Sequence, residues 1–490
     1  MTDAAISTTL ASIDPYDPAA VRSEWRDARS GLLRDGLDRA RSWRFVRAFL
    51  LIALPITAQA LMASSRTVFD VFMTSSLGFE EVAVVGYGSR IVFILILLVL
   101  GICNGAGVVV AQFYGGGSKQ RARDAIGTTM LLSFVISSLG FGLVVALSGP
   151  LAAWSSDDPA IRALALDYLI PAAAMVLPYS IAFAIAVGLR SVGRPGLATG
   201  AAVIGLIANV VLNYALIFGN LGAPALGVRG AAYASVLSFA IEAIMVAACA
   251  LVFFDRGLFS PARFGDYLNA DTIRKTLRVG LPIALGSVIW AIGIFMYSVI
   301  AARAGPEALA VLALVTPIES MAIAVMIGLS STTNVIVGQA LGRGDFRGAT
   351  VDAISLVIWT VAAAILMGAV LWLLKPALLW LYAGAGPGVL AVADDVFDVL
   401  ACVLVVRAIN VTLVVGVLRA GADTAFPILM DVSAQWLVAI PLTAAAVIWL
   451  GLPFPFVFLA INAEEIARLA MAWWRVTRFP WLRRIRPEEE

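Results

Sequence analysis

LPITAQALMASSRTVFDVFMTSSLG, residues 54–78, is the first long apolar run of the chain, and it carries two opposite charges. A helix needs about 20 apolar residues to cross a bilayer, so this run predicts a membrane-spanning helix. Arg66 and Asp70 are four residues apart, which places their side chains on one helical face. An ionised side chain at membrane depth is costly unless it is paired, lines water or takes up a proton. Arg66 and Asp70 are therefore candidates for function.

The composition places the whole chain among membrane proteins. Of its 490 residues, 61% are hydrophobic and only 13% are charged, which is far more apolar than a soluble protein of this length. The apolar residues form continuous runs, which predicts helices and excludes barrel strands. At about 20 residues per span, about twelve runs are long enough to cross a membrane. They begin near residues 46, 82, 124, 161, 196, 229, 278, 307, 350, 393, 425 and 453.

Basic residues are concentrated in alternate loops and at both ends of the chain, although the net charge is only +2. The positive-inside rule places such loops and both termini in the cytoplasm, which requires an even number of spans. We therefore expect an all-α polytopic membrane protein with twelve transmembrane helices. We place it in the cytoplasmic (inner) membrane.

The chain contains no histidine, and its three cysteines lie singly within apolar runs. The lack of histidine excludes histidine-based metal sites and Ser-His-Asp triads. Isolated cysteines indicate neither a disulfide framework nor a metal site. We expect no cofactor, no nucleic-acid partner and no enzymatic activity. A membrane-embedded enzyme, the alternative from a different class, is disfavoured on the same grounds.

A diverged copy of the opening run occurs about 227 residues further along the chain, in the same order as its neighbouring motifs. The matching segments are 54–56 with 281–283, 112–115 with 339–342, and 188–193 with 417–421. This duplication predicts two six-helix bundles related by a pseudo-twofold axis along the membrane normal. Such an arrangement is typical of transporters that open a central cavity alternately to the two sides of the membrane.

The duplication divides the chain into five parts. We expect a cytoplasmic amphipathic segment (1–44), an N-lobe with helices 1–6 (45–255), a cytoplasmic linker (256–277), a C-lobe with helices 7–12 (278–477) and a cytoplasmic tail (478–490). In the first part, apolar residues recur at helical spacing from Val21 to Trp43, with arginines on the other face. This pattern predicts a helix on the inner membrane surface, and a partly disordered basic leader is the alternative.

These motifs together resemble the multidrug and toxic compound extrusion (MATE) family over residues 45–477. The matching pieces are Leu54-Pro55, Phe69-Asp70, the paired Gln112/Gly115 and Gln339/Gly342 motifs, residues 189–191 and 418–421, and the segment 209–232. The resemblance implies an exporter driven by an H⁺ or Na⁺ gradient, with small organic cations or amphipathic molecules as substrates. It also implies a bilayer-embedded protein, which we expect to be a monomer.

Asp70 falls on the family's acidic position in helix 1, which implies a role as the carboxylate that couples transport to cation or proton binding. Asn209 matches a polar position of helix 5 beside that site, and Asn213 stands where some members carry an aspartate. We expect H⁺ rather than Na⁺ as the coupling ion, and a metal role for Asp70 only if Na⁺ is used. Arg66 departs from the family pattern, and its alternative role is a permanent ion pair with Asp70.

The second half lacks the acidic residues that one branch of the family carries there. Trp290 on helix 7 stands about where that branch has a glutamate, and Arg407 and Asn410 on helix 10 stand where it has an aspartate. These departures favour the DinF-like branch over the NorM-like branch. The residue equivalent to Asp70 is Tyr297, so the repeated scaffold itself does not require an acid at this position.

Several further polar residues are candidates for the cavity or the substrate site. Arg90 on helix 2 and Glu319 on helix 8 hold nearly equivalent places in the two halves. One prediction is that they pair across the cavity, or that Glu319 holds a cationic substrate. The alternative is that each pairs with polar groups of its own bundle. The remaining cavity candidates are Tyr297, Trp290 and Asn410. Glu464 is predicted to pair locally with Arg468, four residues later.

The alternative function within transport is a flippase for a lipid-linked precursor from the same superfamily. It would favour a strongly cationic cavity for pyrophosphate, whereas the inward candidates here are mixed in sign. A major-facilitator transporter also has two six-helix halves, but the loop after helix 2 lacks that group's Gly-x-x-x-Asp-Arg-type signature.

Overall fold

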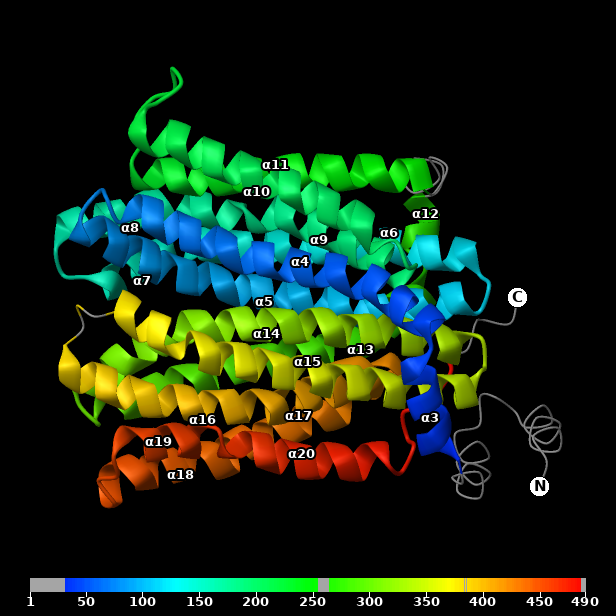
Figure 1. Ribbon diagram of the computed structural model, residues 1–490. Coiled ribbons are helices and arrows are strands. Elements are labelled where there is room, and N and C mark those ends of the chain that lie inside the picture. The colour runs from blue at the N-terminus through cyan, green and yellow to red at the C-terminus, as the bar shows by residue number, and fades with distance from the viewer. Residues whose placement is uncertain (1–30, 254–263, 383, 385, 486–490) are drawn as a thin grey trace. The chain divides into compact units, whose positions relative to one another are not determined.

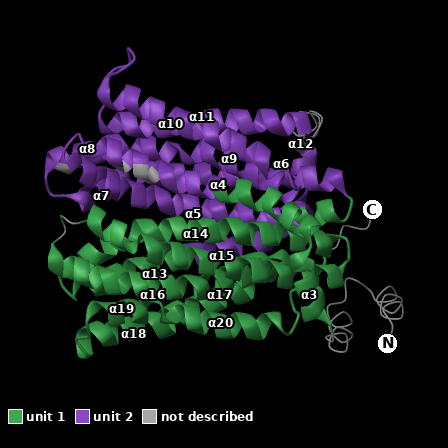
Figure 2. Cartoon of the chain, in the orientation of Figure 1, with its two compact units in different colours: residues 1–57, 111–117, 288–490 green, residues 58–110, 118–287 purple. Residues whose placement is uncertain are grey.

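The structure is a computed structural model that describes residues 31–253, 264–382, 384 and 386–485. Within these residues it contains helices and no strand. The chain forms two compact units (Figure 2). Unit 1 comprises residues 1–57, 111–117 and 288–490, and unit 2 comprises residues 58–110 and 118–287.

Three long helices run from one unit into the other. They are α4 (Trp43–Thr74), α5 (Phe79–Gly115) and α13 (Ala270–Ala302). The rest of unit 2 consists of α6 (Lys119–Ala146), α7 (Ser148–Ser155), α8 (Pro159–Ala174), α9 (Val176–Ser191), α10 (Pro195–Phe218), α11 (Val228–Phe253) and α12 (Phe264–Tyr267) (Figure 1).

The rest of unit 1 begins with α3 (Leu32–Arg41) and continues with α14 (Pro306–Gly342), α15 (Phe346–Leu381) and α16 (Pro387–Val411). Its later helices contain π-helical turns. The π-helical segments are η4 (Thr412–Leu418), η5 (Ser433–Ala439) and η6 (Ala445–Trp449). The α-helices that alternate with them or follow them are α17 (Ala425–Val432), α18 (Ile440–Ala444), α19 (Phe454–Ile461) and α20 (Ala463–Val476).

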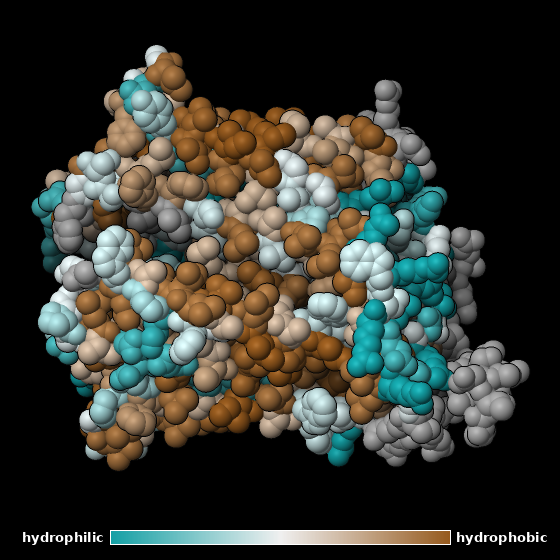
Figure 3. Space-filling view, viewed as in Figure 1, coloured by the Kyte–Doolittle hydropathy of each residue, from teal (hydrophilic) through white to brown (hydrophobic). Residues whose placement is uncertain are grey.

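The all-α polytopic architecture predicted from the sequence is confirmed. Eleven helical segments within the described residues are long and apolar enough to cross a membrane. The predicted twelfth span is divided into α19 and α20 at Asn462, whose side chain donates to the carbonyl of Phe458 at 2.8 Å. Apolar side chains cover the middle of the helices, and hydrophilic ones gather at the end where α3 lies (Figure 3).

Glycines let repeat-equivalent helices approach closely. In unit 2, a Cβ on Gly101 of α5 would lie 2.2 Å from the backbone of Ala284 in α13. In unit 1, a Cβ on Gly328 of α14 would lie 2.6 Å from the backbone of Thr57 in α4. Each pair matches the other at the 227-residue offset predicted from the sequence. Small residues are enriched at membrane-helix contacts because they allow backbones to approach.

The duplicated Gln/Gly motif forms a reciprocal contact within unit 1. A Cβ on Gly115 would lie 2.2 Å from the carbonyl oxygen of Gln339, and one on Gly342 would lie 2.1 Å from that of Gln112. The Gln112 side chain donates to the carbonyl of Ala420 at 2.7 Å and accepts from the backbone of Ile485 at 2.7 Å. The motif thus joins the ends of α5 and α14 to the segment that follows α20.

The amphipathic N-terminal segment is helical in its described part, and residues 21–30 of the predicted helix lie outside the described residues. Leu32, Gly36 and Ala40 of α3 are buried, and α3 packs on α15. Ion pairs join Arg39 to Asp352 at 2.9 Å and Arg347 to Asp35 at 2.7 Å. One face of α3 therefore contacts protein, while Leu33 and Leu37 remain exposed, as does Trp43 at the start of α4.

Candidate functional site

Asp70 lies in a polar cluster of unit 2 formed by α4, α10 and α11. The amide of Asn213 donates to one carboxylate oxygen of Asp70 at 2.6 Å, and the hydroxyl of Ser235 lies 3.5 Å from the other. The same amide lies 3.4 Å from the side-chain oxygen of Asn209. The structure therefore brings together three of the predicted site residues and adds Ser235, for which the sequence offered no signal.

The two asparagines face Asp70 because α10 and α11 form a tight helical hairpin. α10 ends at Gly219, which has a φ of 74°, and a Cβ on Gly230 of α11 would lie 2.3 Å from the carbonyl oxygen of Leu216. Asn209 and Asn213 are four residues apart on α10, so they share one face, and both are fully buried.

Two buried polar atoms of this cluster have no hydrogen-bond partner among the described residues. They are the side-chain nitrogen of Asn209 and the side-chain oxygen of Asn213. A buried amide group without a partner costs free energy, so these atoms are suited to bind water, an ion or a polar ligand group. The side-chain oxygen of Asn213, the carboxylate of Asp70 and the hydroxyl of Ser235 are oxygen ligands of the kind that hard cations prefer, whereas the nitrogen of Asn209 can only donate a hydrogen bond.

Arg66 pairs with Glu242 of α11 at 3.0 Å. Its guanidinium lies over the ring of Phe239, 4.0 Å from the ring centre. Gly205 of α10 leaves room for the pair, because a Cβ there would lie 2.7 Å from Glu242 and 3.0 Å from Arg66. Asp70 makes no ion pair with any described residue. The predicted alternative, a permanent Arg66–Asp70 ion pair, is therefore wrong, because Arg66 has its counterion on another helix.

The corresponding position in unit 1 has different chemistry. The hydroxyl of Tyr297 donates to Glu464 of α20 at 2.7 Å. The backbone carbonyl of Trp290 accepts a hydrogen bond from the side chain of Gln435 at 3.2 Å. Glu464 pairs with Arg468 at 3.1 Å, which confirms the predicted local ion pair. Arg468 also lies 3.2 Å from Asp431, a partner that sequence reasoning missed.

Arg407 of α16 is the centre of a buried network in unit 1. It forms an ion pair with Glu319 of α14, and it pairs with Glu465 of α20 at 3.0 Å and with the side-chain oxygen of Asn462 at 2.7 Å. Asn410 donates to the carboxylate of Glu465 at 2.8 Å. These carboxylates therefore have arginine partners within unit 1.

A pair between Arg90 and Glu319 across the cavity stays a prediction. Glu319 pairs with Arg407 inside its own unit, as the other prediction for it had stated. Arg90 is exposed and makes no ion pair with any of the described residues. Arg90 and Glu319 lie at similar positions of two repeat-equivalent helices, α5 and α14. The partner of Glu319 is decided by the packing of α14 against α16, which carries Arg407.

The described part of the chain contains no group of three histidine, cysteine, aspartate or glutamate residues that could hold a metal ion. Among the predicted site residues, Asp70, Asn209 and Asn213 share one cluster in unit 2. Arg66 lies on the same helix as Asp70 but belongs to the ion pair with Glu242. Tyr297, Trp290, Asn410 and Glu319 lie in unit 1.

Comparisons with known proteins agree with this organisation. The family model MatE matches twice, over residues 55–215 and 282–445, so its second match begins 227 residues after the first. "Probable multidrug resistance protein NorM" of Mesorhizobium japonicum is 28% identical over 455 residues, which are 91% of this chain and 95% of that protein. The protein of the same name from Agrobacterium fabrum is 25% identical over 405 residues, with 81% and 86% covered. A solved structure described as "Crystal structure of MATE in complex with MaL6" has the same fold, with a TM-score of 0.80, 19% identity, and 91% and 99% covered.

Proposed function

Since the chain belongs to the MatE family, we propose that it is a secondary active exporter of small organic molecules, driven by an ion gradient through alternating access of two lobes. Its named relatives are multidrug resistance proteins, which supports drug-like substrates and a transport role instead of an enzymatic one. We further propose that the substrates are cationic or amphipathic and that the protein acts as a monomer in the inner membrane. Both termini then lie in the cytoplasm, as the distribution of basic loops favours.

The observation that carries this proposal is the absence of a counterion for Asp70 among the described residues. Arg66 is the nearest arginine along α4, and its ion pair is with Glu242. A carboxylate in a membrane-spanning helix without an ion pair is costly when ionised, so it favours binding a proton or a cation. A group that must bind and release a charge during each cycle is what gradient-driven transport requires.

We propose H⁺ as the coupling ion. Hydrogen bonds from Asn213 and Ser235 can support either protonation state of Asp70, since the amide donates and the hydroxyl can donate or accept. One proton that crosses about 150 mV supplies roughly 3.5 kcal/mol. That free energy supports a substrate concentration ratio on the order of a few hundred.

We propose that coupling uses the Asp70 cluster alone, as in the DinF-like branch. Three acidic residues within the helices of unit 1 have arginine partners, because Arg407 pairs with Glu319 and Glu465, and Arg468 pairs with Glu464. A carboxylate whose charge is already neutralised by an arginine attracts another cation less strongly. This argument favours a structural role for the network in unit 1.

Transport by purified protein in proteoliposomes tests the proposal. Vesicles with an imposed pH gradient, an imposed Na⁺ gradient or neither would be compared for uptake of a panel of organic cations. We expect uptake with the pH gradient in the absence of Na⁺. Transport that stops only when the Na⁺ gradient is removed would contradict H⁺ coupling, and no uptake under any gradient would contradict the exporter itself.

A further inference from the structure

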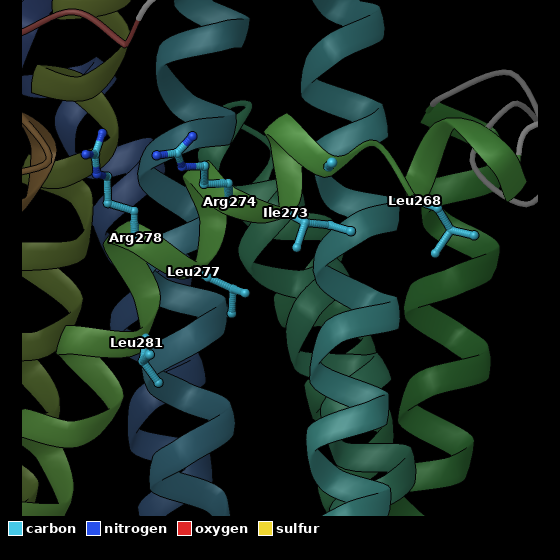
Figure 4. A pocket seen from close by; sticks show the side chains of 7 residues that line it. Leu268, Ile273, Arg274, Leu277, Arg278 and Leu281 are labelled. Carbon is cyan, nitrogen blue, oxygen red and sulfur yellow. The ribbon is translucent and has the colours of Figure 1, made fainter.

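A groove of about 560 Å³ lies along the start of α13 in unit 2 (Figure 4). Its lining combines two arginines with apolar side chains: Leu268, Ala270, Ile273, Arg274, Leu277, Arg278 and Leu281. We propose that this groove binds an anionic phospholipid of the surrounding membrane, with the phosphate on Arg274 and Arg278 and an acyl chain along the leucines. This site is distinct from the Asp70 cluster and does not depend on the proposed coupling mechanism.

The rim of the groove is held by the docking of α12 on α6. The ring of Tyr267 packs against Gly127, where a Cβ would lie 2.6 Å from the ring, and Thr128 donates to the Tyr267 carbonyl at 2.8 Å. Tyr267 is 3% exposed, so this contact fixes the position of the next residue, Leu268, which is 56% exposed. The groove is therefore built from packed elements of unit 2.

The start of α13 is also fixed. The side chain of Asn269 accepts hydrogen bonds from the backbone of Asp271 at 2.8 Å and of Thr272 at 3.0 Å, which caps the helix. These contacts set the direction in which the first turns of α13 present their side chains. Arg274 and Arg278 are one helical turn apart and extend to the same side, as Figure 4 shows.

No described residue forms an ion pair with the two arginines of the groove. Arg274 and Arg278 are both exposed. The nearest acid along the helix, Asp271, already pairs with Lys275. Each guanidinium can bind phosphate oxygens through paired hydrogen bonds, and side chains one helical turn apart can reach the same phosphate group.

The apolar part of the groove favours a lipid over a free anion. Leu277 and Leu281 continue the groove along α13 from the arginines toward the middle of the span, and Leu281 is 48% exposed. A free phosphate would make no contact with these two side chains. A phospholipid would cover it with a chain while its headgroup meets the arginines, as in other basic pockets between membrane helices. The positive-inside rule places this end of α13 on the cytoplasmic side.

Native mass spectrometry of the full-length protein would test the inference. The protein in detergent would be titrated with phosphatidylglycerol, with phosphatidylcholine of the same chains, or with inorganic phosphate. We expect the charge-removing variant Arg274→Gln/Arg278→Gln to bind its tightest phosphatidylglycerol about thirtyfold more weakly, since each of the two arginines contributes about 1 kcal/mol near an anionic lipid. The variant Arg274→Lys/Arg278→Lys, which keeps both charges, should retain most of the binding.

Arg303→Gln is a matched control, because Arg303 is an exposed arginine just beyond the opposite end of α13. It should leave phosphatidylglycerol binding unchanged. Equal binding of phosphatidylglycerol and phosphatidylcholine would overturn the inference, as would unchanged binding by Arg274→Gln/Arg278→Gln. Saturation of the site by inorganic phosphate alone would also overturn it, since the leucine surface would then have no role. Circular dichroism of each variant would verify that it is folded.

Discussion

Arg66 pairs with Glu242 at 3.0 Å and leaves Asp70, four residues further along the same helix, without an ion pair among the described residues. One turn of helix therefore separates a compensated charge from an uncompensated one. The two groups are predicted to behave differently when each is mutated. The ion pair should be required for stability, and Asp70 should be required for transport.

Asp70→Asn is expected to abolish gradient-driven efflux while the protein stays folded and binds substrate. Asparagine keeps the shape of the side chain and can still hydrogen-bond with Asn213, but it cannot exchange a proton. Proteoliposome transport and substrate binding would be measured side by side. Tyr297→Phe is the matched control at the equivalent position of the repeat, and it should retain transport. Normal efflux by Asp70→Asn would remove this residue from the coupling role.

Glu242→Gln is expected to destabilise the protein by about 3–5 kcal/mol, because it leaves the buried guanidinium of Arg66 without a counterion. Replacement of both partners, in Arg66→Met/Glu242→Leu, should recover part of that loss, since no buried charge remains. Thermal unfolding in detergent would measure each variant. If Asp70→Asn lowered stability as much as Glu242→Gln does, the assignment of the ion pair would be wrong.

Arg407→Met is expected to lower the free energy of unfolding by about 3–5 kcal/mol, because it removes the partner of two carboxylates, Glu319 and Glu465. The matched control is Arg90→Met, which removes an exposed arginine that has no ion pair among the described residues. That control should change stability by less than about 0.5 kcal/mol. Equal losses in the two variants would contradict the network around Arg407.

Trp481→Ala is expected to destabilise unit 1 by about 3–5 kcal/mol, because this side chain is only 1% exposed although it follows the last helix. Trp154→Ala is the control, since Trp154 is 86% exposed, and it should have little effect. Gln112→Ala should also destabilise, because it removes hydrogen bonds to Ala420 and Ile485. Limited proteolysis of the C-terminus would show whether the segment after α20 is released, and an unchanged cleavage rate in Trp481→Ala would count against this contact.

Local patterns were enough to predict the class of fold. Each membrane helix needs its own continuous apolar run, so length and hydropathy indicate the spans directly. The final span was harder to delimit, because it divides at Asn462 into two short helices. The contacts of the 227-residue repeat were not visible in the sequence, although the repeat itself was. Only the structure shows that Gly115 lies against Gln339 and Gly342 against Gln112.

The candidate site was predicted only in part. Asp70, Asn209 and Asn213 could be selected because polar groups are rare and costly in apolar helices. Their partners could not, because Ser235 and Phe239 are ordinary residues of α11 that matter only through their position. Glu319 illustrates the same limit, since the sequence left open whether its partner lies across the cavity or in its own bundle, and helix packing provides Arg407.

The order of the residues alone thus decided that this chain is a duplicated, helical membrane protein with Asp70 in one half and Tyr297 at the equivalent position of the other. Hydropathy and internal repetition are properties of the chain itself, so they need no knowledge of distant contacts. Tertiary structure decided which charges are neutralised. Arg66 and Glu242 are 176 residues apart in the sequence, and a counterion so distant is set by the packing of α4 against α11. That packing leaves Asp70 among neutral hydrogen-bonding groups.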